Sequence, residues 1–288
     1  MPKNNILTIG NVEILKGKSV RIDIELPSFY GSPSFLRTYV IRGKKDGPTV
    51  FVSAAIHGDE LNGIEIIRRI RRLSLIKKIR GTLILIPIVN NYGVQNLSRY
   101  LPDRRDLNRS FPGSSKGSLA SRVAEIFYTE VVSKCDLGID LHTASIHKDN
   151  LPQIRANLDN EFTLALAKNF AAPVILHSEL RDGSLRAAVQ DNDIPVLLYE
   201  AGEALRLDER SIKIGVRGIM NVLRHMQMLP ESTRKTTHKP PVITKSSSWI
   251  RASESGMIQT LKKLGDLVQK DEVIAKIYDL IDDTSYDV

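Results

Sequence analysis

The chain has 288 residues, of which 42% are hydrophobic and 26% are charged, and its formal net charge is +8. These are ordinary values for a globular protein, and the length suits one large domain and a small one. No stretch approaches the roughly 18 apolar residues that a membrane span needs, so we expect no membrane partner. The single cysteine, Cys135, excludes an internal disulfide, and the N-terminus has no signal-peptide pattern. Both features favour a cytoplasmic location.

Much of the positive charge is concentrated between residues 68 and 80. Ile64, Ile67 and Ile70 recur every three residues, so the arginines between them fall on the opposite face of a helix. A solvated helix face explains this charge without a ligand. Because neither an aromatic run nor a recognition motif accompanies it, we predict no nucleic-acid partner. The net positive charge is instead suited to attracting a small anionic substrate.

Strands and helices are predicted to alternate along most of the chain. Two segments with polar and apolar residues in alternation come first, and continuous apolar strands separated by helices follow them. The predicted strands are 19–26, 37–42, 49–55, 82–89, 137–141, 173–176 and 195–199, and the predicted helices are 60–74, 118–134, 161–171, 185–190 and 208–228. This order predicts an α/β fold, a three-layer α/β/α sandwich with a mixed, mostly parallel sheet.

Three segments of different composition divide the chain. Residues 1–230 form the predicted main domain, and the polar, proline-rich stretch 231–247 is predicted to be a linker. In residues 248–288, short strands separated by glycines indicate a small all-β domain. There is room in it for only three or four strands, so we expect this domain to be truncated. Completion by a second chain would make the protein a homo-oligomer.

Chemically useful side chains lie at the ends of three predicted strands. His57 and Glu60 follow the strand 49–55, His142 follows 137–141, and Glu200 follows 195–199. Ligands gather at the carboxyl ends of strands in such sheets. Two imidazoles and one carboxylate suit Zn²⁺, and catalytic zinc sites use three protein ligands with an open fourth position. The competing interpretation is that Glu60 stands near a helix start because the helix dipole favours a carboxylate there.

Four separated motifs occur in a recognisable order. They are His-Gly-Asp-Glu at 57–60, Asp-Leu-Asn-Arg-Ser-Phe-Pro-Gly at 106–113, Asp-Leu-His-Thr at 140–143 and Tyr-Glu-Ala-Gly at 199–202. Over roughly residues 45–205 the chain resembles the succinylglutamate desuccinylase/aspartoacylase family, a branch of the zinc-carboxypeptidase-like hydrolases. The resemblance implies that His57, Glu60 and His142 hold one Zn²⁺ per chain and that Glu200 activates the attacking water. Its competitor for that role is Glu203.

The long polar loop 90–117 contributes further residues that the resemblance implies. Asn108 and Arg109 match the pair that holds the substrate carboxylate, and an arginine grips a carboxylate through two parallel hydrogen bonds. Asp106 matches a residue beside a ligand histidine. Arg99 is the first candidate for the arginine that stabilises the oxyanion, with Arg104 and Arg105 as competitors.

The sequence therefore predicts a zinc-dependent hydrolase that cleaves an amide or ester bond in a small N-acylated anionic molecule such as an N-acyl amino acid. The alternatives are a metallocarboxypeptidase that acts on peptides and a non-catalytic zinc-binding or ligand-binding module. Specificity is expected in loops around 144–155 and 178–186, where Arg155, Arg181 and Arg186 are candidates to recognise a second anionic group.

Overall fold

A computed structural model describes residues 6–232 and 240–288. The chain divides into two compact units, Met1–Ile243 and Thr244–Val288. Strand β11 (Val242–Thr244) lies within the predicted linker and joins the sheet of the first unit next to β9 (Val174–His177). Residues 233–239 of the predicted linker lie outside the described residues. The proposed domain boundaries at 230 and 247 therefore remain a prediction.

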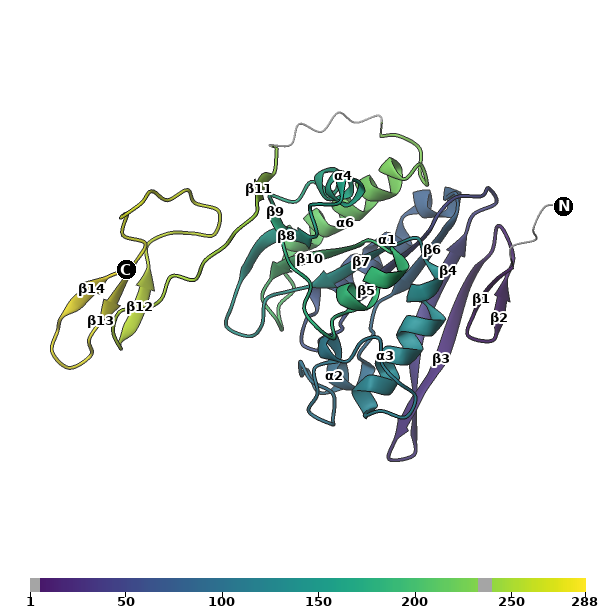
Figure 1. Cartoon of the computed structure of the whole chain (residues 1–288), viewed down its shortest axis with the longest axis horizontal. Helices are drawn as coiled ribbons and strands as arrows, with labels where there is room; N and C mark the ends of the chain where they lie inside the picture. Colours follow the sequence, from purple (N-terminus) through teal and green to yellow (C-terminus); the bar gives the residue numbers. More distant parts are fainter. Residues whose placement is uncertain (1–5, 233–239) are drawn as a thin grey trace. The chain divides into compact units, whose positions relative to one another are not determined.

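The first unit is built on a nine-stranded mixed sheet with the order β11-β9-β8-β10-β7-β5-β6-β4-β3 (Figure 1). Strands β6, β5, β7 and β10 are parallel neighbours, whereas β3, β4 and β8 pair antiparallel with their neighbours β4, β6 and β10. The remaining sheet strands are β3 (Ser19–Phe29), β4 (Ser32–Arg42), β5 (Thr49–Ala54), β6 (Thr82–Ile86), β7 (Leu137–His142), β8 (Asn150–Ala156) and β10 (Val196–Gly202).

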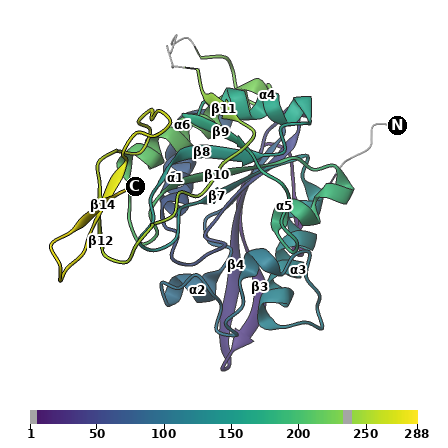
Figure 2. The ribbon, with the colours of Figure 1, turned by 60° about the vertical axis from the view of Figure 1, so that its left-hand side comes forward.

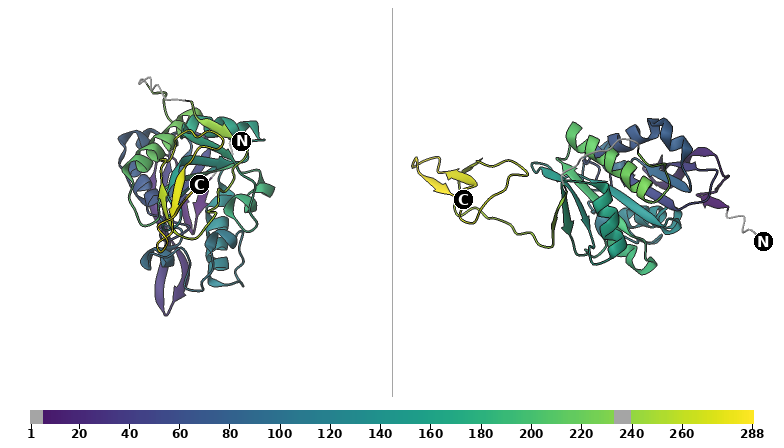
Figure 3. Two further views of the ribbon diagram at one scale, coloured as in Figure 1. Left: turned by 90° about the vertical axis from the view of Figure 1, so that its left-hand side faces the viewer. Right: turned by 90° about the horizontal axis from the view of Figure 1, so that it is seen from above.

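Helices cover both faces of this sheet, which confirms the predicted α/β/α sandwich (Figures 2 and 3). One face carries α1 (Asn62–Arg72), α4 (Glu161–Phe170) and α6 (Glu209–His225). The other carries α2 (Asn91–Gln95), α3 (Leu119–Glu130) and α5 (Leu185–Ala188), together with the hairpin of β1 (Leu7–Ile9) and β2 (Val12–Ile14). Four short 3₁₀ turns are η1 (Ser74–Lys78), η2 (Leu107–Arg109), η3 (Val132–Lys134) and η4 (Gln190–Asn192).

The core has two layers, one on each side of the sheet. Strands β5, β6 and β7 are buried along almost their whole length, which explains their continuous apolar sequences. On one side, Ile66, Ile67 and Ile70 of α1 pack against the sheet together with apolar residues of α4 and α6. On the other side, Phe51 and Phe127 meet edge to face, with ring centroids 6.0 Å apart. Both layers hold the strand ends that carry the candidate site in a fixed register.

Strand β8 differs from the sequence-based prediction of a loop around residues 144–155. Its sequence, Asn-Leu-Pro-Gln-Ile-Arg-Ala, contains a proline and several polar residues. A proline inside a central strand is unusual because it removes one ladder hydrogen bond. The pairing of β8 with both β9 and β10 outweighs that loss.

The second unit contains a three-stranded antiparallel sheet in the order β12-β13-β14, as the predicted all-β appendage requires. Its strands are β12 (Met257–Thr260), β13 (Ala275–Tyr278) and β14 (Ser285–Asp287). Within the described ranges 6–232 and 240–288, none of the helices is both long and apolar enough to span a bilayer.

Candidate metal centre and active site

The three predicted metal ligands meet at the carboxyl edge of two neighbouring parallel strands. His57 follows β5, Glu60 precedes α1, and His142 is the last residue of β7. His57 Nδ1 lies 2.7 Å from Glu60 Oε1, and His142 Nδ1 lies 2.8 Å from Glu60 Oε2. One ligand atom from each residue lies within 4.8 Å of the other two, and all three residues are buried. This arrangement brings two imidazole nitrogens and a carboxylate to one point.

Each imidazole also contacts an outer carboxylate through its second nitrogen. His57 Nε2 lies 3.0 Å from Asp106 Oδ1, and His142 Nε2 lies 2.8 Å from Asp140 Oδ2. When each Nε2–H donates to its outer carboxylate, both Nδ1 lone pairs face the carboxylate of Glu60. Positive charge between these groups, from protons on the imidazoles or from a metal ion, removes the repulsion between the lone pairs. The donor set therefore fits a divalent metal such as Zn²⁺, whose imidazole ligands usually donate their other N–H to an acceptor.

The pKa shifts have the same electrostatic origin. Burial lowers the pKa of both histidines, but the negative charges of Glu60 and, for His142, of Asp140 outweigh it, so both pKa values are raised. Burial likewise raises the pKa of Glu60, but the two histidines outweigh it and hold this pKa below its ordinary value. The group therefore attracts positive charge, which a proton or a metal ion can supply.

Of the three candidate arginines in the long loop, Arg99 lies at this group. Its Nη2 donates to Asp106 Oδ2 at 2.9 Å, and its Nη1 lies 3.5 Å from Glu60 Oε1. Arg104 and Arg105 are exposed. The side chain of Asp106 also accepts a hydrogen bond from the backbone N–H of Asn108 at 2.8 Å and so starts the turn η2. Asp106 thus joins the loop, Arg99 and His57.

Asn108 and Arg109 follow Asp106 in the same loop, and their side chains contact backbone groups of the chain. The Asn108 Oδ1 accepts a hydrogen bond from the backbone N–H of Leu185 at 3.0 Å, which ties the loop to the start of α5. Arg109 is exposed and its guanidinium donates to the carbonyl oxygen of Asn108. A carboxylate-binding role for this pair remains a prediction.

Glu200 lies on β10 in register with His142 of the parallel neighbour β7. Residues in register on neighbouring strands present their side chains to the same face of the sheet. Glu200 Oε2 accepts a hydrogen bond from Asn150 Nδ2 at 2.7 Å and lies 3.5 Å from Arg155 Nε. The competitor Glu203 instead accepts a hydrogen bond from the backbone N–H of His147 at 3.0 Å.

Two of the three arginines considered for specificity lie near Glu200. Arg186 Nη2 donates to the carbonyl oxygens of Ser178 and Glu179 at 2.9 and 2.7 Å. Burial, together with the charge of the nearby Arg155, lowers the pKa of Arg186 to about 10. Arg186 Nη1 is buried and has no hydrogen-bond partner among the described residues, whereas the buried Arg155 Nε forms the ion pair with Glu200. Arg181, by contrast, is exposed.

Three residues of this site were not predicted from the sequence. Asp140 stands two residues before His142 on β7, and Ser53 Oγ on β5 donates to Asp140 Oδ1 at 2.7 Å. Residues i and i+2 of a strand lie on the same face, so the pattern Asp-x-His could have identified Asp140. No comparable signal identifies Ser53, or Asn150 of the missed strand β8.

Comparison with known proteins agrees with this architecture. The sequence profile of the succinylglutamate desuccinylase/aspartoacylase catalytic domain matches residues 46–226, and the chain therefore belongs to that family. It is 28% identical over 264 residues to an N-alpha-acetyl-L-2,4-diaminobutyric acid deacetylase of Halomonas elongata, covering 88% of this chain and 76% of the relative. Family membership and this relative support a hydrolase that acts on amide bonds.

Solved structures show the same fold. A succinylglutamate desuccinylase/aspartoacylase from Rhodobacter sphaeroides superimposes with a TM-score of 0.82 at 24% identity, over 93% of this chain and 86% of that chain. The product-bound ectoine utilization protein EutE (DoeB) from Ruegeria pomeroyi gives a TM-score of 0.81 at 24% identity, over 94% of this chain and 86% of that one.

Proposed function

We propose that this protein is a zinc-dependent deacylase that hydrolyses the amide bond of a small N-acylated amino acid. The observation that carries the proposal is the buried group of His57, Glu60 and His142, in which both imidazoles contact an outer carboxylate and turn their other nitrogen toward Glu60. A purely structural zinc site normally has four protein ligands, whereas three ligands are typical of catalytic zinc.

His57, Glu60 and His142 would hold the zinc ion, which would supply Lewis-acid chemistry: a more nucleophilic water near neutral pH and a polarised scissile carbonyl. Glu200 accepts the proton of the attacking water and later delivers it to the leaving amine. Asn150, whose amide donates to Glu200 at 2.7 Å, orients that carboxylate. Arg99 offers positive charge to the carbonyl oxygen as negative charge develops on it.

The substrate is expected to carry negative charge near Glu200. The buried Nη1 of Arg186, which has no hydrogen-bond partner among the described residues, supports this expectation, because an unpaired buried donor is costly and an anion would satisfy it. The Halomonas relative is named for a substrate whose side chain carries an amine. We therefore expect this chain to prefer an N-acetyl amino acid with a carboxylate side chain over one with an ammonium side chain.

The first test is the metal content of the purified protein, compared between wild type and His57→Ala. The expected result is about one zinc per chain in wild type and none in the variant. Release of free amine from N-acetyl amino acids with anionic, neutral and cationic side chains then measures activity, with Glu200→Gln as the inactive control. A wild-type protein that takes up no zinc, or that hydrolyses none of these amides when loaded with zinc, would contradict the proposal.

A further inference from the structure

A long basic groove lies on the sheet face that carries α1. It consists of three adjoining hollows. The first and second share Tyr39 and Arg71 in their linings, and the second and third share Ser19, Ile41 and Lys77. Their cavity volumes are about 320, 450 and 760 Å³. A single small-molecule site usually occupies about 300–1,000 Å³, so the groove has room for an extended segment rather than for one small ion.

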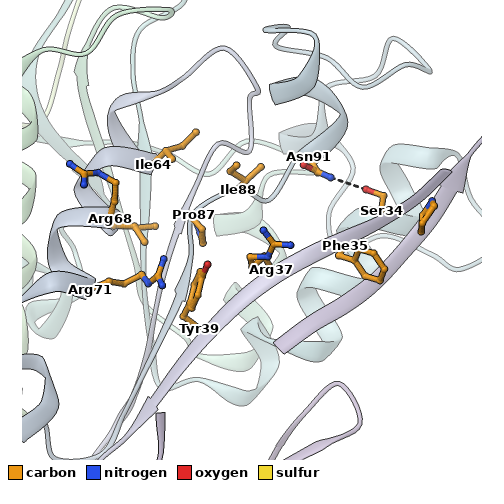
Figure 4. Close-up of a pocket in the computed structure, with 12 residues that line it drawn as sticks. Ser34, Phe35, Arg37, Tyr39, Ile64, Arg68, Arg71, Pro87, Ile88 and Asn91 are labelled. Atoms are coloured by element: carbon orange, nitrogen blue, oxygen red, sulfur yellow. Dashed lines mark hydrogen bonds between the residues drawn. The ribbon is translucent and has the colours of Figure 1, made fainter. Parts of the chain in front are cut away.

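The groove arises from the length of the β3–β4 hairpin. Strand β4 pairs with β6 only from Tyr39 to Arg42, so the half of β4 that precedes Tyr39 extends beyond the central strands. One face of β4 packs into the core through Leu36 and Val40. Its other face presents Phe35, Arg37 and Tyr39, and a gap remains between this face and helix α1 (Figure 4).

The lining of the groove is basic throughout. The first hollow has Arg37, Arg68 and Arg71 and no acidic residue, and the second has Arg21, Arg71 and Lys77 and no acidic residue. In the third, seven lysines and arginines accompany a single acidic residue, Glu231. Hollows with one sign of charge and low-dielectric walls concentrate the electrostatic potential. This groove therefore attracts anions.

Arg71 and Lys77 have no acidic partner of their own among the described residues, unlike Arg37 and Arg68. Arg37 pairs with Asp23 and Arg68 pairs with Glu65. None of the ion pairs within the described ranges of the chain includes Arg71 or Lys77, and both side chains are exposed. Arg71 and Lys77 stand in the two stretches that the hollows share, so their charge is available to a ligand that passes from one hollow to the next.

The floor of the groove indicates which kind of anion fits. In the first hollow, Ile64, Pro87 and Ile88 provide apolar surface between the arginines (Figure 4). The guanidinium carbon of Arg71 lies 3.3 Å from the centroid of the Tyr39 ring, so this ring face is already covered. Proteins that bind single-stranded nucleic acids use a series of free aromatic faces, whereas Phe35 is the only other aromatic side chain in the described lining.

We propose that this groove binds an extended acidic peptide segment of a partner protein, in which Asp or Glu alternates with apolar residues. Successive side chains of an extended peptide point to opposite sides. The apolar side chains would face the isoleucines of the floor, and the carboxylates would face Arg71, Lys77 and the other basic side chains of the rim. The site is independent of the proposed metal group, because no residue of that group lines it.

The test uses the full chain and a fluorescein-labelled peptide of five Asp-Leu repeats, with binding followed by fluorescence anisotropy. Charge reversal at Arg71 (Arg71→Glu) or at Lys77 (Lys77→Glu) is expected to weaken binding by about tenfold or more. The matched control is Arg72→Glu, which makes the same charge change on the same helix at an exposed residue outside the groove lining. Arg71→Glu removes the contact with Tyr39. If that variant does not fold, Lys77→Glu by itself tests the proposal.

Five outcomes would overturn the proposal. The first is no binding of the Asp-Leu peptide, and the second is an equal loss in all three variants. The third is equally tight binding of an Asp-Ser peptide of the same length, because the apolar floor would then contribute nothing. The fourth is tighter binding of a ten-nucleotide oligothymidylate, because a nucleic acid would then be the occupant. The fifth is a dimer in sedimentation that Arg71→Glu dissociates, because a second copy would then be the occupant.

Discussion

The carboxyl edge of the sheet and the basic groove both concentrate charged side chains. The charges at the sheet edge are buried and paired, whereas two in the groove are exposed and belong to no ion pair within the described part of the chain. At the sheet edge, His57, Glu60 and His142 are at most 5% exposed, and each contacts an oppositely charged group. In the groove, Arg71 and Lys77 are exposed and belong to no ion pair among the residues the structure describes. Buried, mutually paired charges hold a fixed geometry, as chemistry requires, whereas exposed charges of one sign attract a partner from a distance.

This comparison predicts that catalysis depends on the sheet edge and tolerates changes in the groove. The largest effect is expected for His57→Ala and His142→Ala, each of which removes a proposed metal ligand. We expect loss of bound zinc and a fall in kcat on the order of 10³-fold or more. Elemental analysis and amine release measure the two quantities. His225→Ala, an exposed histidine at the end of α6, is the control. Full metal content in both ligand variants would contradict the assignment.

Glu200→Gln is expected to lower kcat by about 10²–10⁴-fold while zinc remains bound, because the amide cannot accept the proton of the attacking water. Glu203→Gln should retain nearly the wild-type rate, since Glu203 contacts the backbone of His147 instead. Steady-state kinetics on both variants separate the two glutamates. The reverse result would transfer the role of the base to Glu203.

The arginine assignment can be tested in the same way. Arg99→Lys is expected to reduce kcat by about 10²-fold, because a lysine cannot contact Asp106 and Glu60 together and still present charge to the substrate. Arg105→Lys makes the same change at an exposed residue of the same loop and should have little effect. Equal losses in the two variants would argue against a specific role for Arg99.

Helix α1 packs closely against the central strands at Gly63, near the start of the helix. A Cβ at this position would lie 2.6 Å from the Cβ of Ala54, on the strand that precedes His57, and 2.8 Å from that of Leu141, on the strand that ends with His142. Gly63→Ala should therefore lower the free energy of unfolding by about 1–3 kcal/mol. Denaturant unfolding measures this change. Gly31→Asn is the control, since it lies in open space at the tip of the β3–β4 hairpin, where an asparagine tolerates the positive φ of 75°.

The smallest effect is expected for Asn150→Ala, which removes the hydrogen bond to Glu200. Removal of a residue that orients a functional group typically lowers activity by about tenfold. We therefore expect kcat to fall by about tenfold while KM stays nearly unchanged. Asn150→Asp should not restore the rate, because a carboxylate would repel Glu200. A change confined to KM would mean that Asn150 contacts the substrate rather than the base.

Local sequence patterns predicted most of the fold. The apolar segment 49–55 forms β5 (Thr49–Ala54), and the segment 161–171 forms α4 (Glu161–Phe170), because periodicity and continuous burial leave a clear signal in a short window. Strand β8 was missed because Pro152 and its polar neighbours resemble a loop. Only pairing with β9 and β10, which are distant in sequence, makes this segment a central strand.

The sequence by itself determined which residue types stand at the strand ends and in which order, and hence that His57, Glu60, His142 and Glu200 belong to one edge of a sheet. Only the tertiary structure decided that Arg99 rather than Arg104 or Arg105 approaches this edge, and that Asn150 contacts Glu200. It also decided that arginines expected on a solvated helix face line a groove against β4. The physical reason is that such contacts depend on strand register and on packing between distant segments, which no local pattern records.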